Sequence, residues 1–376
     1  KYLDDGQSKH RAYGNHMWEF EEKDRNREID KNKLGYGVPL QSWARTSEKQ
    51  LARWFHQDGI KNWREIYDTD PYTLSLTMRE DGLDVLVDLN GIYWPSNIAV
   101  MSENSCPIRV GVFALPEPSF SPGITHVLAD DLTSSASEEV LLEGQENITI
   151  NGSLFTRSPY VMLTNKSSTP ALKNDFITFG GLTSLLNVSP DCAMLWSELL
   201  HKIPKSRLLF CGGLDTDETV KKTLYEYFAH NGLIDRIGFV DQKQSKSETQ
   251  PELAEARISN EVWHEIDIFL DTFPTNCTDV LCESLWAGSP VITMKSNRRA
   301  GLSGASILFA AKRPNWIAST RNEFIKIGKE LTANIESLDR ERKRLQKNMP
   351  NSNLFSPHLL AKEVQEKLSS AIKNDS

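Results

Sequence analysis

The sequence predicts an α/β protein with parallel β-sheets, arranged as two lobes whose strand ends face a cleft. The first observation is Ile266–Met294, which reads as a buried strand, a short loop, a helix and a second strand. Continuous apolar runs of this length are typical of parallel strands covered on both faces. The second is that predicted strands alternate with helices, as βαβ units require. The third is a polar stretch, Thr149–Asn174, which we interpret as the connection between the lobes.

Length and composition limit the possible function classes. The chain has 376 residues, enough for two domains of ordinary size, and is 39% hydrophobic and 25% charged. A net charge of −8 argues against nucleic acid as the main partner. No run approaches the roughly 18 apolar residues of a membrane span, and the first residues lack a signal-peptide core. We therefore expect a cytoplasmic protein with neither a membrane nor a nucleic-acid partner.

The cysteines predict free thiols. They number five, an odd count, and none has metal-ligand spacing with histidines, so we expect no metal site. They are Cys106, Cys192, Cys211, Cys277 and Cys282.

The N-terminal lobe is expected over residues 50–160. Residues 1–49 are charged and weakly periodic, which suggests an extension or a remnant of a domain. The predicted elements are helices over Glu48–Gln57 and Pro71–Arg79, and strands over Asp84–Leu89, Ile108–Ala114 and Thr125–Ala129.

The C-terminal lobe is expected over residues 175–376. Together the two lobes are Rossmann-like, and ligands bind such sheets outside the carboxyl ends of their strands. The predicted strands are Phe176–Phe179, Arg207–Cys211, Ile237–Val240, Ile266–Leu270 and Val291–Met294. The predicted helices are Pro190–Ile203, Val220–Asn231, the segment after Thr278, and the charged amphipathic Arg321–Leu345 and His358–Ser370.

The helix that follows Ile266–Leu270 is the first candidate binding element. A strand end that feeds a helix N-terminus presents free N–H groups and a positive dipole end, which favour a phosphate. Thr278 or Asp279 is expected to cap this helix, although the Thr278 hydroxyl also suits a phosphate. The Asp279 carboxylate would repel a diphosphate. The segment therefore predicts a nucleotide site.

Four separated blocks of sequence resemble a known family. They are KNWREIYDTDPYTLSLTMREDGLDVLVDLNG, ending at Gly91; CPIRVGVFALPEPSFSPGITHVLAD, ending at Asp130; FITFGGLTSLLNVSPDCAMLWSELLHKIPKSRLLF, ending at Phe210; and Ile266–Met294 with AGLSGASILFA and NSNLFSPHLLAKEVQEKL. Together they resemble the catalytic region of the O-GlcNAc transferase / SPINDLY family of protein O-glycosyltransferases, over about residues 50–370.

The resemblance implies a GT-B fold of two Rossmann-like lobes and transfer of a sugar to Ser or Thr of a protein or peptide. The implied donor is a nucleotide sugar, UDP-GlcNAc or GDP-fucose, without a metal or other cofactor. The family's opening strand and histidine-bearing loop should precede residue 50 and are not found there, so a shortened N-terminal lobe is expected. We likewise expect no tetratricopeptide array before the domain.

The resemblance also implies where the donor binds. Asn187 stands where the family has a diphosphate-binding lysine, and Ser184 replaces a polar residue nearby. Gly212 and Gly213 stand at a second basic position, where they form either a phosphate-binding nest or a plain turn. Cys277 lies in what is a glycine-bearing loop in the family, directly before Thr278 and Asp279.

Further candidates lie on either side of this loop. Glu283 matches the family's acidic residue on the ribose hydroxyls, or is a solvated helix glutamate. His264 precedes a strand and is expected close to the nucleotide side. Arg298 and Arg299 are candidate cations or a solvated loop pair.

Two functions are consistent with these residues, and neither assigns a catalytic residue. One is a nucleotide-sugar glycosyltransferase with an altered cleft; the other is a non-catalytic relative that binds or regulates a partner. A different sugar-handling enzyme on the same fold is a third, weaker alternative.

Overall fold

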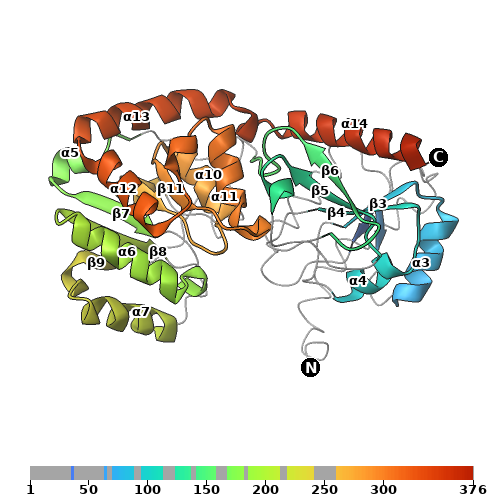
Figure 1. Ribbon diagram of the computed structural model, residues 1–376, viewed down its shortest axis with the longest axis horizontal. Helices are drawn as coiled ribbons and strands as arrows, with labels where there is room; N and C mark the ends of the chain where they lie inside the picture. Colours follow the sequence, from blue (N-terminus) through green and yellow to red (C-terminus); the bar gives the residue numbers. More distant parts are fainter. Residues whose placement is uncertain are drawn as a thin grey trace, which may run out of the picture. The chain divides into compact units, whose positions relative to one another are not determined.

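The computed structural model describes residues 35–37, 63–65, 70–88, 95–112, 123–136, 141–157, 167–181, 185–211, 218–240 and 260–375. The chain divides into two compact units, Lys1–Thr69 and Asp70–Ser376. In the first unit, β1 (Gly35–Gly37) and β2 (Trp63–Glu65) pair in parallel. The helix predicted over Glu48–Gln57 lies outside the described residues. The second unit contains two parallel sheets (Figure 1).

The smaller sheet has four parallel strands in sequence order. Its first three strands match the predictions. Its fourth strand, Glu146–Ile150, overlaps the start of Thr149–Asn174, the stretch interpreted above as the connection between the lobes. That interpretation was wrong where the two overlap. The reason is that ENITI has only two apolar residues, Ile148 and Ile150, both buried. The elements are α3 (Pro71–Glu80), β3 (Val85–Asp88), α4 (Pro95–Ser102), β4 (Ile108–Val112), β5 (His126–Asp130) and β6 (Glu146–Ile150).

The larger sheet has six parallel strands in the order β12-β11-β10-β7-β8-β9. Its predicted strands are confirmed to within two residues at each end. The strands are β7 (Ile177–Gly181), β8 (Ser206–Cys211), β9 (Ile237–Val240), β10 (Ile268–Leu270), β11 (Val291–Met294) and β12 (Ile317–Ala318).

Helices connect these strands and cover the sheet (Figure 1). They bury Trp196, Phe210 and Phe269 completely in one hydrophobic core. The helices are α5 (Ala171–Asn174), α6 (Pro190–Lys202), α7 (Glu218–His230), α9 (Asn260–Trp263), α10 (Thr278–Ala287), α11 (Ser303–Ala310), α12 (Arg321–Thr332), α13 (Ile335–Asn348) and α14 (Pro357–Asp375). Short 3-10 helices are η3 (Thr133–Ser135), η5 (Leu185–Asn187), η6 (Ile234–Arg236), η7 (Arg299–Gly301), η8 (Pro314–Trp316), η9 (Met349–Asn351) and η10 (Asn353–Phe355).

The strand order creates a topological switch point between β7 and β10. From β7 the chain proceeds outward through α6 to β8 and β9, whereas from β10 it proceeds in the other direction through α10 to β11 and β12. The connections after β7 and β10 therefore lead to opposite sides of the sheet, and such a switch point, at the carboxyl ends of the strands, is where ligands bind in sheets of this kind. This topology sets the place of the candidate site.

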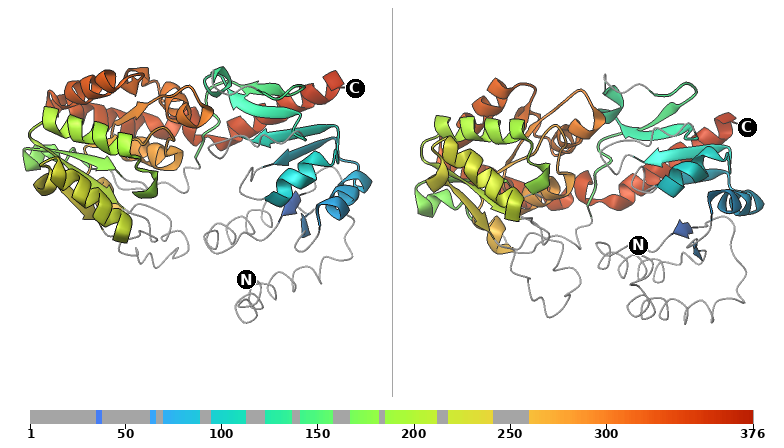
Figure 2. Two further views of the ribbon diagram at one scale, coloured as in Figure 1. Left: turned by 60° about the horizontal axis from the view of Figure 1, so that its bottom comes forward. Right: turned by 90° about the horizontal axis from the view of Figure 1, so that it is seen from below.

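The last helices differ from the predictions in two ways. The predicted helix Arg321–Leu345 is two helices, because Asn334 accepts a hydrogen bond from the Ser337 N–H at 2.6 Å and caps α13. Helix α14 packs along β6 of the smaller sheet (Figure 2), with Leu360, Val364 and Leu368 against its core. The last helix therefore belongs with the N-terminal sheet, although the sequence analysis placed it in the lobe of residues 175–376.

Within the described part of the chain, no helix is both long and apolar enough to span a membrane.

Candidate functional site

The two loops at the switch point contact each other directly. The side-chain amide of Asn187, after β7, lies 3.6 Å from the Sγ of Cys277, after β10. The Ser189 hydroxyl donates to the Phe273 carbonyl at 2.9 Å and accepts from the Cys192 N–H at 3.1 Å, which caps α6. Two residues that the resemblance assigned to the donor site, Asn187 and Cys277, are therefore brought together.

The start of α10 is built differently from the prediction. Cys277 occupies the N-cap position and no side-chain cap is made, so Thr278 and Asp279 lie inside the first turn and neither caps the helix. Instead, the Cys277 N–H donates to a carboxylate oxygen of Asp271 at 2.9 Å. The stabilising acceptor comes from the end of β10, six residues earlier. A local capping pattern does not reveal such a contact.

Asp271 lies at the centre of a buried polar network beneath the loop. Its other carboxylate oxygen accepts from the Thr293 hydroxyl at 2.7 Å. Asn276 donates to the Thr272 carbonyl at 3.0 Å and accepts from the Gly304 N–H at 2.9 Å. Burial raises the pKa of Asp271 to about 7, although these hydrogen bonds act in the opposite direction. The network attaches the loop to β11 and α11 and fixes the direction of α10.

The backbone at Gly304 passes so close to this network that only a glycine fits there. A Cβ at Gly304 would lie 2.5 Å from Thr293 Oγ1 and 2.6 Å from the Asp271 carboxylate. Any larger residue would therefore displace the groups that hold the loop.

Arg157 brings a positive charge to the first turn of α10. Its Nη2 lies 2.8 Å from a carboxylate oxygen of Asp279, and its side chain is about one-third exposed at 31%. The Arg157 backbone N–H donates to the Leu354 carbonyl at 2.7 Å, which holds the segment in place. Sequence reasoning missed Arg157, because it lies in the polar stretch interpreted as a connection. The stretch also contains Lys166 and Lys173, so no sequence signal distinguishes Arg157 as the basic residue of the site.

Glu283 lies one turn further along α10 than Asp279 and is partly buried. Burial raises the pKa of the neighbouring Cys282 thiol to about 12, and the negative charges of Asp279 and Glu283 act in the same direction, against the charge of Arg157. Glu283 is thus close to the Arg157–Asp279 pair. Its role on a ribose stays a prediction.

Other predicted site residues are not brought to this place. Ser184, Gly212 and Gly213 lie outside the described residues. His264 precedes β10, whereas Cys277 follows it, so the two lie at opposite edges of the parallel sheet. The expectation that His264 lies on the nucleotide side was therefore wrong.

The two candidate arginines after β11 have different environments. Arg298 is exposed, whereas Arg299 is buried and donates to the Asn147 side chain at 3.0 Å. Arg299 is therefore not part of a solvated loop pair. Among the described residues there is no group of three or more His, Cys, Asp or Glu side chains placed to hold a metal ion.

The chain is similar to several known proteins. It is 27% identical over 294 residues to the Hordeum vulgare protein named "Probable UDP-N-acetylglucosamine–peptide N-acetylglucosaminyltransferase SPINDLY", covering 77% of this chain and 30% of the relative. It is 23% identical over 305 residues to the Caenorhabditis elegans UDP-N-acetylglucosamine–peptide N-acetylglucosaminyltransferase, covering 80% of this chain and 24% of the relative. The chain thus spans less than a third of the length of these relatives.

Solved structures share the fold. A mutant O-GlcNAc transferase of Thermobaculum terrenum aligns with a TM-score of 0.68 and 17% identity, covering 91% of this chain and 63% of that one. Anabaena Alr3699/HepE, in complex with UDP and glucose, aligns with a TM-score of 0.54 and 14% identity, covering 85% and 89%. The two parallel sheets of this chain form a GT-B fold, as predicted.

The sequence model of glycosyl transferase family 41 matches residues 153–364, more than half of the chain. This match includes the loops at the switch point, Arg157 and all of α10. The chain therefore belongs to glycosyl transferase family 41.

Proposed function

We propose that this chain transfers a sugar from a nucleotide sugar to a Ser or Thr hydroxyl of a protein acceptor. In this reaction the bond between the anomeric carbon and the diphosphate oxygen breaks and a bond to the acceptor oxygen forms. The hydroxyl proton is released and the nucleoside diphosphate leaves. The observation that carries the proposal is the contact of Asn187 with Cys277 at the switch point, directly before α10.

The main chemical task is to stabilise negative charge on the departing diphosphate. The first N–H groups of α10 have no side-chain cap, and the positive end of the helix dipole lies beside them. The Asn187 amide is a further hydrogen-bond donor. Arg157 offers the charge that a lysine at position 187 would provide, and its Nε is buried without a hydrogen-bond partner among the described residues.

For the donor we propose UDP-GlcNAc, with GDP-fucose as the alternative. The printed names of the relatives from Hordeum vulgare and Caenorhabditis elegans support a UDP-sugar and a peptide acceptor. Glu283 is the residue proposed to accept hydrogen bonds from the ribose hydroxyls. It is near enough to the first turn of α10 to contact a nucleotide whose diphosphate lies there.

We propose a cytoplasmic location for this reaction. The four cysteines whose surroundings the structure describes are free thiols, three of them buried. A reducing compartment is where such thiols persist.

Calorimetric titration of the chain with UDP, GDP, UDP-GlcNAc and GDP-fucose tests the donor site. We expect micromolar binding of one nucleotide and its sugar, followed by transfer to a Ser- or Thr-containing peptide detected by mass spectrometry. Absence of binding to all four by a folded sample would contradict the proposal.

A second candidate is a non-catalytic relative that binds a nucleotide or a partner protein. It is favoured by the Asp279 carboxylate in the first turn of α10, where a negative charge opposes a diphosphate. Nucleotide binding with no transfer and no hydrolysis of the donor would support this candidate over the enzyme.

A further inference from the structure

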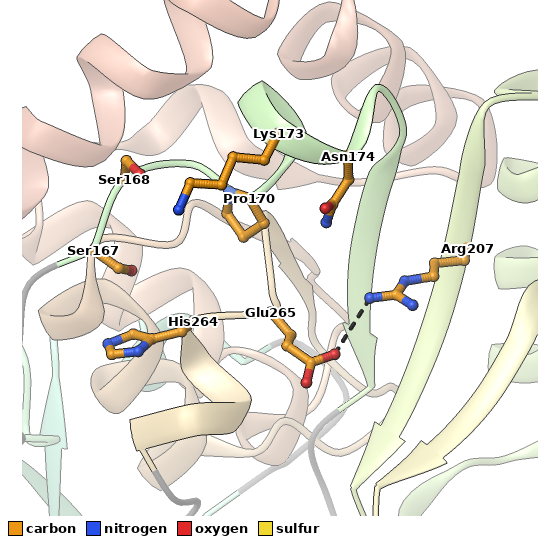
Figure 3. A pocket seen from close by; sticks show the side chains of 8 residues that line it. All are labelled: Ser167, Ser168, Pro170, Lys173, Asn174, Arg207, His264 and Glu265. Atoms are coloured by element: carbon orange, nitrogen blue, oxygen red, sulfur yellow. Dashed lines mark hydrogen bonds and ion pairs between the residues drawn. The ribbon is translucent and has the colours of Figure 1, made fainter.

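A polar cavity of about 400 Å³ opens at the edge of the six-stranded sheet opposite to the start of α10. Its lining includes Ser167, Ser168, Lys173, Arg207, His264 and Glu265 (Figure 3). Arg207 lies at the start of β8, and Glu265 lies just before β10. Because the strands are parallel, these amino ends and the loops of the candidate donor site lie at opposite edges of the sheet. The cavity is therefore a separate place on the molecule.

The charges that line the cavity are mostly positive, in a chain whose net charge is −8. Glu265 is the single carboxylate among the described lining residues, and it lies 3.3 Å from Arg207, which offsets its charge. Lys173 is exposed and takes part in no ion pair with any described residue. In Figure 3 its side chain extends toward the part of the cavity that carries Ser167 and Ser168, whereas Glu265 points toward Arg207. Among the described residues, Lys173 in that part of the cavity therefore has no carboxylate within ion-pair distance.

The wall that carries the serines is held rigidly from behind. Arg342, only 1% exposed, donates to the Ser167 hydroxyl oxygen at 3.1 Å and to the Ser167 carbonyl at 3.2 Å. Gln346 donates to the same carbonyl at 3.0 Å. Since the Ser167 hydroxyl oxygen already accepts a hydrogen bond, its own hydrogen is left to donate elsewhere.

The buried layer behind this wall is close to neutral. Burial lowers the pKa of Arg342 to about 10, so the guanidinium is still charged at neutral pH. The buried Asp267 carboxylate lies in the same layer and accepts N–H groups of Ala171 and Thr178 at 2.9 and 2.7 Å. The two charges offset each other, and the nearby Asp175 is paired with Lys205. A third carboxylate, Asp339, accepts the Thr169 N–H at 3.1 Å and is paired with Lys343 at 2.6 Å. The positive character of the cavity thus comes from its own lining.

We propose that this cavity binds a phosphomonoester group, held by Lys173, His264 and the hydroxyls of Ser167 and Ser168. A phosphate accepts hydrogen bonds from all of these donors, and charge-assisted bonds are the strongest of them. The volume exceeds that of a single phosphate and leaves room for the group that carries it. None of the described lining residues is Phe, Tyr or Trp, and the one aromatic ring among them, the His264 imidazole, serves in this proposal as a hydrogen-bond donor. The phosphate is therefore the recognised part, whether it belongs to a small metabolite or to a phosphorylated protein segment.

Titration of the full chain with inorganic phosphate, O-phosphoserine and a phosphoserine peptide tests this proposal, with binding followed by calorimetry. We expect the double variant Lys173→Met/His264→Gln to weaken binding of each ligand at least about tenfold. The matched control is Lys362→Met on α14, which removes one exposed lysine that does not line the cavity. It should change affinity less than about twofold. Thermal melting of all variants checks that they are folded.

Comparing the affinities of O-phosphoserine and the phosphoserine peptide distinguishes the two sources of phosphate. Peptide binding at least about tenfold tighter than O-phosphoserine would identify a phosphorylated protein segment, and equal affinities a small phosphoester. Three results would overturn the proposal: no binding by the unaltered chain, binding that the double variant leaves unchanged, or displacement of the phosphate by UDP. The last result would mean that phosphate enters the candidate donor site. Phosphate binding is measured first without nucleotide and UDP is added only afterwards, so a failure to bind phosphate leaves the proposed transferase function unaffected.

Discussion

Arg157 and Asp279 are 122 positions apart in the sequence, yet their charged groups lie 2.8 Å apart in the first turn of α10. The pair is partly solvated, with the Asp279 side chain 69% exposed, so its own contribution to stability is about 0–1 kcal/mol. Its importance is positional. It sets a cation and an anion at the place where a diphosphate is proposed to bind.

Removing the anion is expected to improve nucleotide binding. Asp279→Asn keeps the shape of the side chain but removes its repulsion of the diphosphate, and it frees Arg157 to contact the diphosphate. UDP or GDP should therefore bind about threefold to tenfold more tightly. Calorimetry measures the change. Glu336→Gln, in the first turn of α13, is the control and should have no effect. Weaker binding by Asp279→Asn would show that the carboxylate assists the ligand.

Removing the cation is expected to have the opposite effect. Arg157→Met retains much of the apolar stem and should weaken nucleotide binding by about 1–3 kcal/mol, the range for a lost charged hydrogen bond. Arg321→Met, which removes an arginine paired with Glu198, is the matched control. An affinity unchanged by Arg157→Met would exclude a contact between Arg157 and the diphosphate.

Glu283 is expected to bind the ribose. Glu283→Ala should weaken the binding of UDP or GDP by about 1–3 kcal/mol. It should weaken the binding of inorganic diphosphate far less, because diphosphate has no ribose. Competition binding with the two ligands measures this difference. Glu366→Ala on α14 serves as a control for the loss of one helix glutamate. Equal losses for nucleotide and diphosphate would point to a general electrostatic role instead.

The raised pKa of Asp271 predicts that the stability of the chain depends on pH. Burial raises its pKa from 3.8 to about 7 in the folded chain, so the folded state holds a proton that the unfolded state has released. The contribution of this group to the free energy of unfolding should therefore fall between about pH 4 and pH 7, by about 1.4 kcal/mol per pH unit at most.

The neutral variant Asp271→Asn tests this contribution. Its stability relative to the unaltered chain should rise as the pH increases across this window, as measured by urea unfolding. Asp267 has a pKa raised to about 6 by the same cause, so the comparison must be made against the unaltered chain at each pH. A stability difference that is constant with pH would show that Asp271 stays ionised.

Cys277 should be the thiol that reports on the candidate donor site. It is partly exposed, whereas burial raises the pKa of Cys106 to about 11 and of Cys282 to about 12, and raises that of Cys192 as well. Iodoacetamide should therefore label Cys277 first among these four thiols, and a bound nucleotide should slow the labelling. Mass spectrometry of the labelled peptides measures both effects. Labelling at an unchanged rate under saturating nucleotide would place the ligand elsewhere.

Sequence patterns predicted most of the fold because those patterns are local. The apolar runs of β10 and β11 and the amphipathic helix over Pro190–Ile203 each depend on a few neighbouring residues. Strand β6 was missed because only two of its residues are apolar. The edge position of His264 was misjudged because its distance along the chain from the α10 loop does not show on which side of a parallel sheet it lies.

Two parallel α/β lobes, a helix after β10 and the resemblance to one glycosyltransferase family could all be inferred from the amino-acid sequence. Periodicity, breakers and short motifs are sufficient for these conclusions. Four contacts became visible only in the three-dimensional structure: Asp271 accepts the Cys277 N–H, Arg157 pairs with Asp279, Asn187 contacts Cys277, and α14 packs on β6. Three of these contacts join segments far apart in the sequence, and the fourth spans a loop. They arise because the order of the strands brings the segments together, which no local pattern encodes.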